Sequence, residues 1–198
     1  MNEKKPLSLV IIVLGIAMFF SYHIYYHFMG ITNNNLVENY YKKEEKIENN
    51  QMDLVKKISN EEELNNQYTG ILNIPKINLE TGFFDINNKK NNVNNSVTLL
   101  KESIMPGNGN SIIYLAAHSG VGYLAFFKNL NKLTNDDMIF LNYNNKRYSY
   151  IITDIYEMPK NGKITVNRNI NEEYLVLTTC SKNENMQLVV VSKLLNII

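Results

Sequence analysis

The most constraining feature of the sequence is an uncharged apolar run near the N-terminus, from Leu7 to Tyr26. It is about as long as the stretch that an α-helix needs to cross the hydrocarbon core of a bilayer. His27, Phe28 and Met29 follow the run and offer no small-x-small cleavage site, so a retained anchor is favoured over the alternative, a cleaved signal peptide. We therefore predict a cytoplasmic tip and transmembrane anchor over residues 1–29.

Flanking charge predicts the orientation of this anchor. Lys4 and Lys5 precede the apolar run, and the next basic residue after it is Lys42. Because positive residues beside a membrane span favour the cytoplasmic side, the N-terminus is expected in the cytoplasm and the rest of the chain outside. The predicted localisation is a single-pass protein of the cell membrane with its main domain on the extracellular face.

The segment after the anchor, residues 30–67, is polar and charged, with interleaved Glu and Lys and widely spaced apolar residues. This pattern predicts a partly helical stalk with solvated faces. Spacing the following domain from the membrane is its simplest role.

Residues 68–198 carry short runs of β-branched and apolar residues separated by Asn, Gly and Asp, which predicts an all-β domain. Asn144 and Asn145 join two of these runs as a hairpin, since Asn tolerates the positive φ of a tight turn. Residues 124–133 space their apolar side chains as one or two short helical turns would. A closed barrel is expected because exposed strand edges invite aggregation. The predicted strands are 70–74, 79–84, 111–117, 138–143, 146–158, 174–179 and 187–194.

Composition excludes several kinds of function. The 20 Lys and Arg residues against 19 Asp and Glu give a formal net charge of +1, too little to gather nucleic acid. A single cysteine allows neither an intramolecular disulfide nor a multi-Cys zinc site. No glycine-rich phosphate loop or acidic metal-binding run occurs, so no cofactor is expected. Cys180, the one cysteine, is either buried filler or reactive.

Two residues at predicted strand ends could carry chemistry. Cys180 ends the segment YLVLTTC, where its side chain can leave the sheet and meet solvent, and a thiolate there would be a nucleophile. His118 follows the segment SIIYLAA at another strand end. Cysteine nucleophiles usually pair with an imidazole that is distant in sequence and close in space. Taken singly, each residue is better explained by a structural role, with catalysis as the alternative.

Several ordered segments together resemble the sortase family, the cysteine transpeptidases that attach surface proteins to the envelope of Gram-positive bacteria. GILNIPKINLETGFF is similar to the family's opening strands, and SIMPGNGNSIIYLAAHSG to the segment that ends in its catalytic histidine. LVLTTC resembles the Thr-Leu-x-Thr-Cys signature, with Val176 in place of its first Thr. The resemblance runs from about residue 68 to the C-terminus; the subclass is open.

The resemblance implies an eight-stranded β-barrel with short helices and a peptide substrate that carries an LPxTG-like sorting signal. Cleavage after the Thr of that signal would leave a thioacyl enzyme on Cys180, with His118 as acid and base. An amine of a peptidoglycan precursor or of another surface protein would then resolve it, without a metal. Thr178 and Thr179 are implied as substrate-binding positions, although packing is an equal alternative for Thr179.

One position departs from the family pattern. Sortases usually carry an arginine on the strand after the cysteine, which stabilises negative charge on the substrate carbonyl. Gln187 occupies that position here. Three explanations stay open: Gln187 serves as a neutral donor, Arg168 reaches in from the loop before the cysteine strand, or the chain is a weakly active or non-catalytic module that binds sorting signals.

Overall fold

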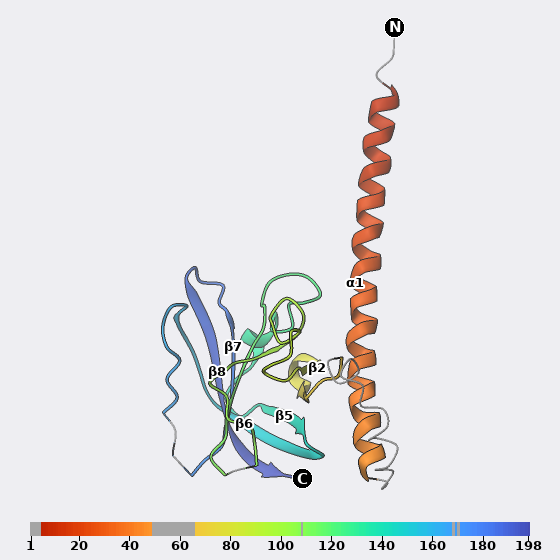
Figure 1. Cartoon of the computed structure of the whole chain (residues 1–198). Coiled ribbons are helices and arrows are strands. Elements are labelled where there is room, and N and C mark those ends of the chain that lie inside the picture. The colour runs from red at the N-terminus through yellow and green to blue at the C-terminus, as the bar shows by residue number, and fades with distance from the viewer. Residues whose placement is uncertain (1–4, 49–65, 108, 168, 170) are drawn as a thin grey trace.

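The computed structural model describes residues 5–48, 66–107, 109–167, 169 and 171–198. It consists of one long helix, α1 (Lys5–Glu48), standing beside an eight-stranded β-sheet (Figure 1). The N-terminal half of α1 projects beyond the sheet. The part of the predicted stalk from residue 49 to 65 lies outside the described residues.

The sheet is rolled into a nearly closed barrel, with strand order β2-β1-β5-β6-β8-β7-β4-β3. A parallel bridge between Phe83 and Val97 links its two edges. The predicted barrel is therefore confirmed. Its strands are β1 (Gly70–Ile74), β2 (Leu79–Phe83), β3 (Thr98–Leu99), β4 (Ile112–Ala116), β5 (Met138–Tyr143), β6 (Lys146–Pro159), β7 (Tyr174–Cys180) and β8 (Met186–Ile197).

Most strand boundaries agree with the predicted runs of apolar and β-branched residues. The exception is β3, which spans only Thr98–Leu99 and was not predicted, because two residues are too few to show a period. Asn144 and Asn145 have φ of 52° and 58°, as the predicted tight turn between β5 and β6 requires. Two single turns of 3₁₀-helix, η1 (Pro75–Ile77) and η2 (Leu130–Lys132), complete the domain, and η2 lies within the segment predicted to contain short helical turns.

The barrel strands bury different side chains on their two faces. Alternate residues of β4 and β7, such as Ile113, Leu115, Leu175 and Leu177, lie in the main core. Their neighbours, including Val176, form a second apolar cluster on the outer face, which Ile164 and Val166 of the β6–β7 connection partly cover. The alternation along β7 therefore assigns Cys180 to the outer face.

The C-terminal half of α1 is fastened to β1 and β2. Val37 and Tyr40 are buried against Tyr68, Ile71 and Phe84. One polar network lies inside this contact, built around Asn33. Its Oδ1 accepts hydrogen bonds from the Tyr68 hydroxyl at 3.0 Å and the Thr81 hydroxyl at 2.9 Å, and its Nδ2 donates to the Glu80 carbonyl at 3.3 Å.

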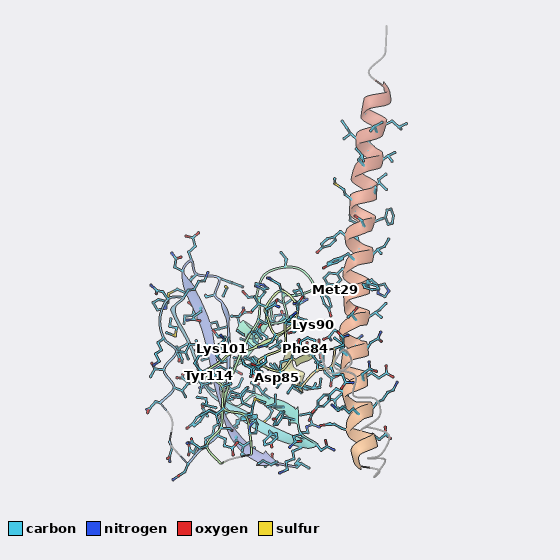
Figure 2. All side chains as sticks on the ribbon, viewed as in Figure 1. Met29, Phe84, Asp85, Lys90, Lys101 and Tyr114 are labelled. Carbon is cyan, nitrogen blue, oxygen red and sulfur yellow. The ribbon has the colours of Figure 1, made fainter. Side chains whose placement is uncertain are left out.

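The N-terminal half of α1 is apolar and uncovered. Within the described residues, the helix from Ser8 to Glu45 is long and apolar enough to cross a membrane, and none of its most apolar window is buried against the barrel. In Figure 2 the side chains of this half point freely away from the helix on all sides. Such a helix fits either a single-pass anchor or a signal sequence.

Candidate active site

Cys180 and the residues around His118 meet at the end of two adjacent strands. β4 and β7 run parallel, and their register pairs Ala116 with Thr178. Continuing that register by two residues sets His118 opposite Cys180. Because in-register residues of neighbouring parallel strands point to the same side, both side chains belong to the outer face. Both are exposed to solvent.

Hydroxyl side chains hold the two segments together where the strand ladder ends. Thr179 Oγ1 donates to the Ala117 carbonyl at 2.6 Å, and Ser119 Oγ donates to the Cys180 carbonyl at 2.6 Å. The Ala117 amide still donates to the Thr178 carbonyl at 3.3 Å. These bonds lie on both sides of His118, so its backbone is fixed beside that of Cys180.

His118 has hydrogen-bond partners on both its ring and its backbone. Its Nε2 lies 3.3 Å from Oδ1 of Asn94, an exposed residue of the loop before β3. Because an amide oxygen accepts hydrogen bonds and cannot donate, this contact favours the tautomer with the proton on Nε2 and orients the ring. The His118 carbonyl accepts a hydrogen bond from the Phe127 amide at 3.0 Å. Asn94 is a site residue that the sequence did not reveal.

A carboxylate fixes the turn that follows Cys180. Glu157 on β6 accepts hydrogen bonds from the Ser181 hydroxyl and, at 2.6 Å, from Nδ2 of Asn183. These two bonds hold the pKa of Glu157 below its ordinary value of 4.5. Glu157 and Cys180 line one surface cavity of about 380 Å³, together with Lys128. The thiol therefore faces a hollow that a peptide segment could enter.

Gln187 lies directly across β7 and β8 from Cys180. Cross-strand partners project to the same face of a sheet, so Gln187 and Cys180 share the outer face. The Thr178 hydroxyl donates to its Oε1 at 3.0 Å, and its Nε2 donates to the Pro159 carbonyl at 3.2 Å. An amide nitrogen has two hydrogens, so one donor of Gln187 is left for a substrate oxygen.

The remaining predicted site residues are placed as follows. Thr178 and Thr179 are both buried, and the structure gives each a hydroxyl bond within the protein. Arg168 lies outside the described residues. Within the described parts of the chain, no group of three or more His, Cys, Asp or Glu side chains is arranged to hold a metal ion.

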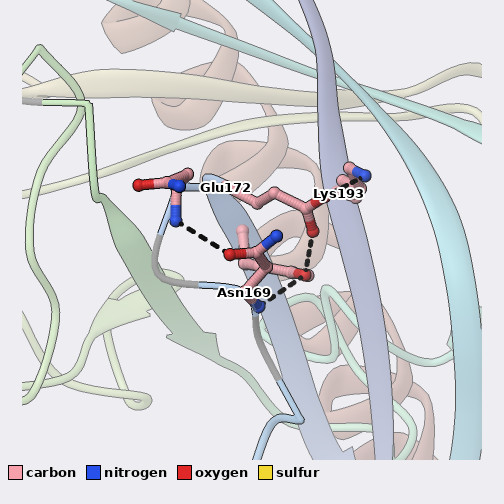
Figure 3. Close-up of polar contacts among 5 residues, drawn as sticks. Asn169, Glu172 and Lys193 are labelled. Carbon is pink, nitrogen blue, oxygen red and sulfur yellow. Dashed lines mark hydrogen bonds and ion pairs between the residues drawn. The ribbon is translucent and has the colours of Figure 1, made fainter.

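The opposite end of β7 is anchored by a separate polar cluster (Figure 3). Glu172 accepts a hydrogen bond from the Tyr174 hydroxyl and forms an ion pair with Lys193 of β8. The Asn169 amide in turn donates to the Tyr174 hydroxyl at 3.4 Å. The hydrogen bond from Lys193 holds the pKa of Glu172 below its ordinary value. This cluster fixes the start of the strand whose other end carries Cys180.

The fold and the site define a class of protein: a nearly closed β-barrel that presents an exposed thiol at the end of one strand, beside a histidine that follows the parallel neighbour. The family model described as "Sortase domain" matches residues 72–195, more than half of the chain. The chain therefore belongs to the sortase family.

Solved sortase structures share the fold. Sortase C of Streptococcus pneumoniae superposes with a TM-score of 0.58 at 23% identity, covering 65% of this chain and 69% of that one. Sortase C-1 of Actinomyces oris gives 0.58 at 18% identity, with 65% and 74% covered. A lid mutant of sortase A from Corynebacterium diphtheriae gives 0.59 at 17% identity, with 65% and 70% covered. No curated protein sequence matches the chain significantly.

Proposed function

We propose that this protein is a membrane-anchored cysteine transpeptidase that cleaves an LPxTG-like sorting signal and transfers the surface protein to a cell-wall amine. Residues 1–29 would form the anchor, 30–67 the connection and 68–198 the catalytic barrel. The observation that carries the proposal is the parallel register of β4 and β7, continued by the Thr179 and Ser119 hydroxyl bonds.

The proposed reaction starts from the thiolate of Cys180 and the imidazolium of His118, which form when the thiol proton moves to the imidazole. The sulfur attacks the carbonyl carbon of the scissile peptide bond, a C–S bond forms, and the C–N bond breaks while His118 protonates the departing amine. The incoming amine then gives its proton to His118, its nitrogen forms a new C–N bond, and the C–S bond breaks. The thioester conserves the acyl energy, so no other energy source is needed.

Gln187 is the proposed neutral donor to the substrate oxygen. Its place opposite Cys180 and its one spare N–H support this role. It brings no positive charge, so stabilisation of the developing oxyanion is expected to be weaker than with arginine. Removing a single oxyanion donor costs on the order of 10²-fold to 10³-fold in other enzymes.

The same neutral position supports the second candidate, a weakly active or non-catalytic module that binds sorting signals. Both the oxygen and the nitrogen of the Gln187 amide already have protein partners. This candidate predicts that the protein binds an LPxTG peptide without cleaving it.

The two candidates are separated by turnover of a fluorogenic LPxTG reporter by the full chain, with a small amine such as hydroxylamine as acceptor. The transpeptidase predicts reporter cleavage, an amine-dependent product, and no turnover by Cys180→Ala or His118→Ala. Binding of the reporter without cleavage, or equal cleavage by Cys180→Ala, would rule out the transpeptidase.

A further inference from the structure

The height of the barrel above the proposed anchor is set by α1. This helix continues without a break from the apolar run into the segment fastened to β1 and β2. An α-helix rises 1.5 Å per residue, so Asn33, the first fastened residue, lies only about 10 Å along the axis from Tyr26. Tyr41 and Glu44 extend the fastening through hydrogen bonds with Asn142 and Asn145. The barrel therefore cannot swing freely away from the end of the apolar run.

Aromatic residues mark that end of the run and reach the candidate site. Tyr22 and Tyr26 are near neighbours, and the Tyr26 ring meets the Tyr123 ring edge-on at 6.0 Å. Tyr123 belongs to the segment that follows His118. Tyrosine is enriched at membrane–water interfaces because its ring is apolar and its hydroxyl is wet. The segment after His118 is thus level with the outer end of the proposed membrane span.

This contact also borders an open surface cavity. It has a volume of about 360 Å³, and its walls include Tyr22 and Tyr26 from α1 and His118, Gly120 and Val121 from the barrel. His118 therefore lines the same cavity as the tyrosines at the end of the apolar run.

The tip of the segment after His118 is apolar and exposed. Val121 is fully exposed to solvent, and Gly122 beside it has φ of +116°, which lets the chain turn back sharply there. The apolar surface of a fully exposed valine stays in water, which is less favourable than burial in an apolar environment. Insertion into the interfacial layer of a bilayer would recover it.

Basic residues lie on two turns at the same end of the barrel. Lys182 is in the β7–β8 turn together with Glu184, and Lys160 and Lys163 follow β6, so lysines outnumber carboxylates on these turns. The Lys160 amide donates to the Asn185 carbonyl at 2.9 Å, so the two turns touch. In Figure 1 the β7–β8 turn is at the end of the barrel toward the N-terminal half of α1, and the C-terminus is at the opposite end. Lysine side chains close to an anionic lipid surface are attracted to its headgroups.

We propose that this end of the barrel rests on an anionic lipid surface, with Val121 inserted in the interfacial layer and Lys160, Lys163 and Lys182 against the headgroups. The proposal rests on the anchoring stated under the proposed function. It means that the thiol of Cys180 works within reach of the headgroups, so the groups that react there are presented at the bilayer surface and not far out in the wall.

The test uses the absence of tryptophan from the sequence. Val121→Trp in the full chain places a single reporter at the tip, and Leu195→Trp, at a residue 61% exposed near the C-terminal end of β8, is the matched control. Both are reconstituted in vesicles of phosphatidylglycerol and phosphatidylcholine that carry bromine on the acyl chains. We expect blue-shifted, strongly quenched emission from Trp at position 121 and unshifted, several-fold weaker quenching at position 195.

Two further measurements complete the design. Gly120→Trp is a second reporter at an open position of the same segment, and it should be quenched like Val121→Trp. Replacing Lys160, Lys163 and Lys182 by Glu should lower the quenching at position 121 in the anionic vesicles. Pure phosphatidylcholine vesicles should show little difference between the lysine and glutamate forms.

The outcomes distinguish this proposal from the one on which it rests. If the chain sediments with vesicles but both position 121 and position 120 are quenched no more than position 195, the membrane-contacting surface is wrong and the anchor stands. If the chain does not associate with vesicles at all, the anchoring fails and this proposal fails with it. Neither membrane result tests the proposed peptide cleavage, which is measured separately with the fluorogenic reporter.

Discussion

Replacing Asn33 by Ala is expected to loosen the contact between α1 and the barrel. The substitution removes three hydrogen bonds, from Tyr68 and Thr81 and to the Glu80 carbonyl, and Thr81 is completely buried. A buried polar group left without a partner costs about 1–3 kcal/mol. Allowing the two hydroxyls to bond partly to each other, the total loss of unfolding free energy is about 2–4 kcal/mol.

The assay is urea unfolding of the full chain in detergent micelles, followed by circular dichroism. With a slope of about 2 kcal/mol per molar urea, the midpoint should fall by about 1–2 M. Thr32→Ala is the control, because Thr32 is exposed and its hydroxyl bonds only to the Phe28 carbonyl within the helix. Equal midpoints for Asn33→Ala and Thr32→Ala would refute the reasoning. A double-mutant cycle with Tyr68→Phe should show coupling between the two side chains.

Three further predictions concern the packing and the site. Gly82→Ala should lower the unfolding free energy by about 1–3 kcal/mol, since a Cβ there would lie 2.1 Å from Cδ2 of Tyr68. Gly15→Ala is the control, because a Cβ at position 15 has no atom within 4 Å. Equal stabilities of the two variants would count against the close packing of Gly82 on Tyr68. Ser119→Ala should lower kcat/KM for reporter cleavage by about 2-fold to 10-fold, because it removes the hydrogen bond to the Cys180 carbonyl. Ser119→Thr should retain activity, and full activity of the alanine variant would contradict the role of that bond. Glu157→Gln should lower Tm at neutral pH, because Ser181 and Asn183 depress the pKa of the Glu157 carboxylate. The stabilisation by the carboxylate is present above the ordinary pKa of 4.5 and is lost as the pH falls through the lower folded pKa, so below the folded pKa wild type and variant should have the same Tm. A Tm difference that does not change with pH would oppose this explanation.

The barrel could be predicted from the sequence because its longer strands are runs of mostly apolar and β-branched residues separated by Asn, Gly and Asp. β7 and β8 are the clearest case, since their inner and outer residues fill two separate apolar clusters. The two-residue β3 carries no such signal. Nor did the sequence show that Val37 and Tyr40 bury themselves against the barrel, because only their neighbours across β1 and β2 supply the apolar surface.

The candidate site was predictable only in part for a similar reason. Cys180 and His118 stand at strand ends and carry chemically distinctive groups, so they could be singled out. Asn94, Ser119 and Glu157 could not, because each is an ordinary polar residue whose role arises from contacts with distant segments. In an Asn-rich chain, nothing local marks Asn94 among its neighbours.

The measurement that tests the central claim most directly is intact-mass spectrometry of the full chain incubated with a panel of sorting peptides. The account predicts an acyl adduct on Cys180, with the mass of the peptide up to its Thr, that disappears when an amine acceptor is added. His118→Ala should accumulate little or none of it. Binding of the peptides with an unmodified Cys180 across the pH range would contradict the claim.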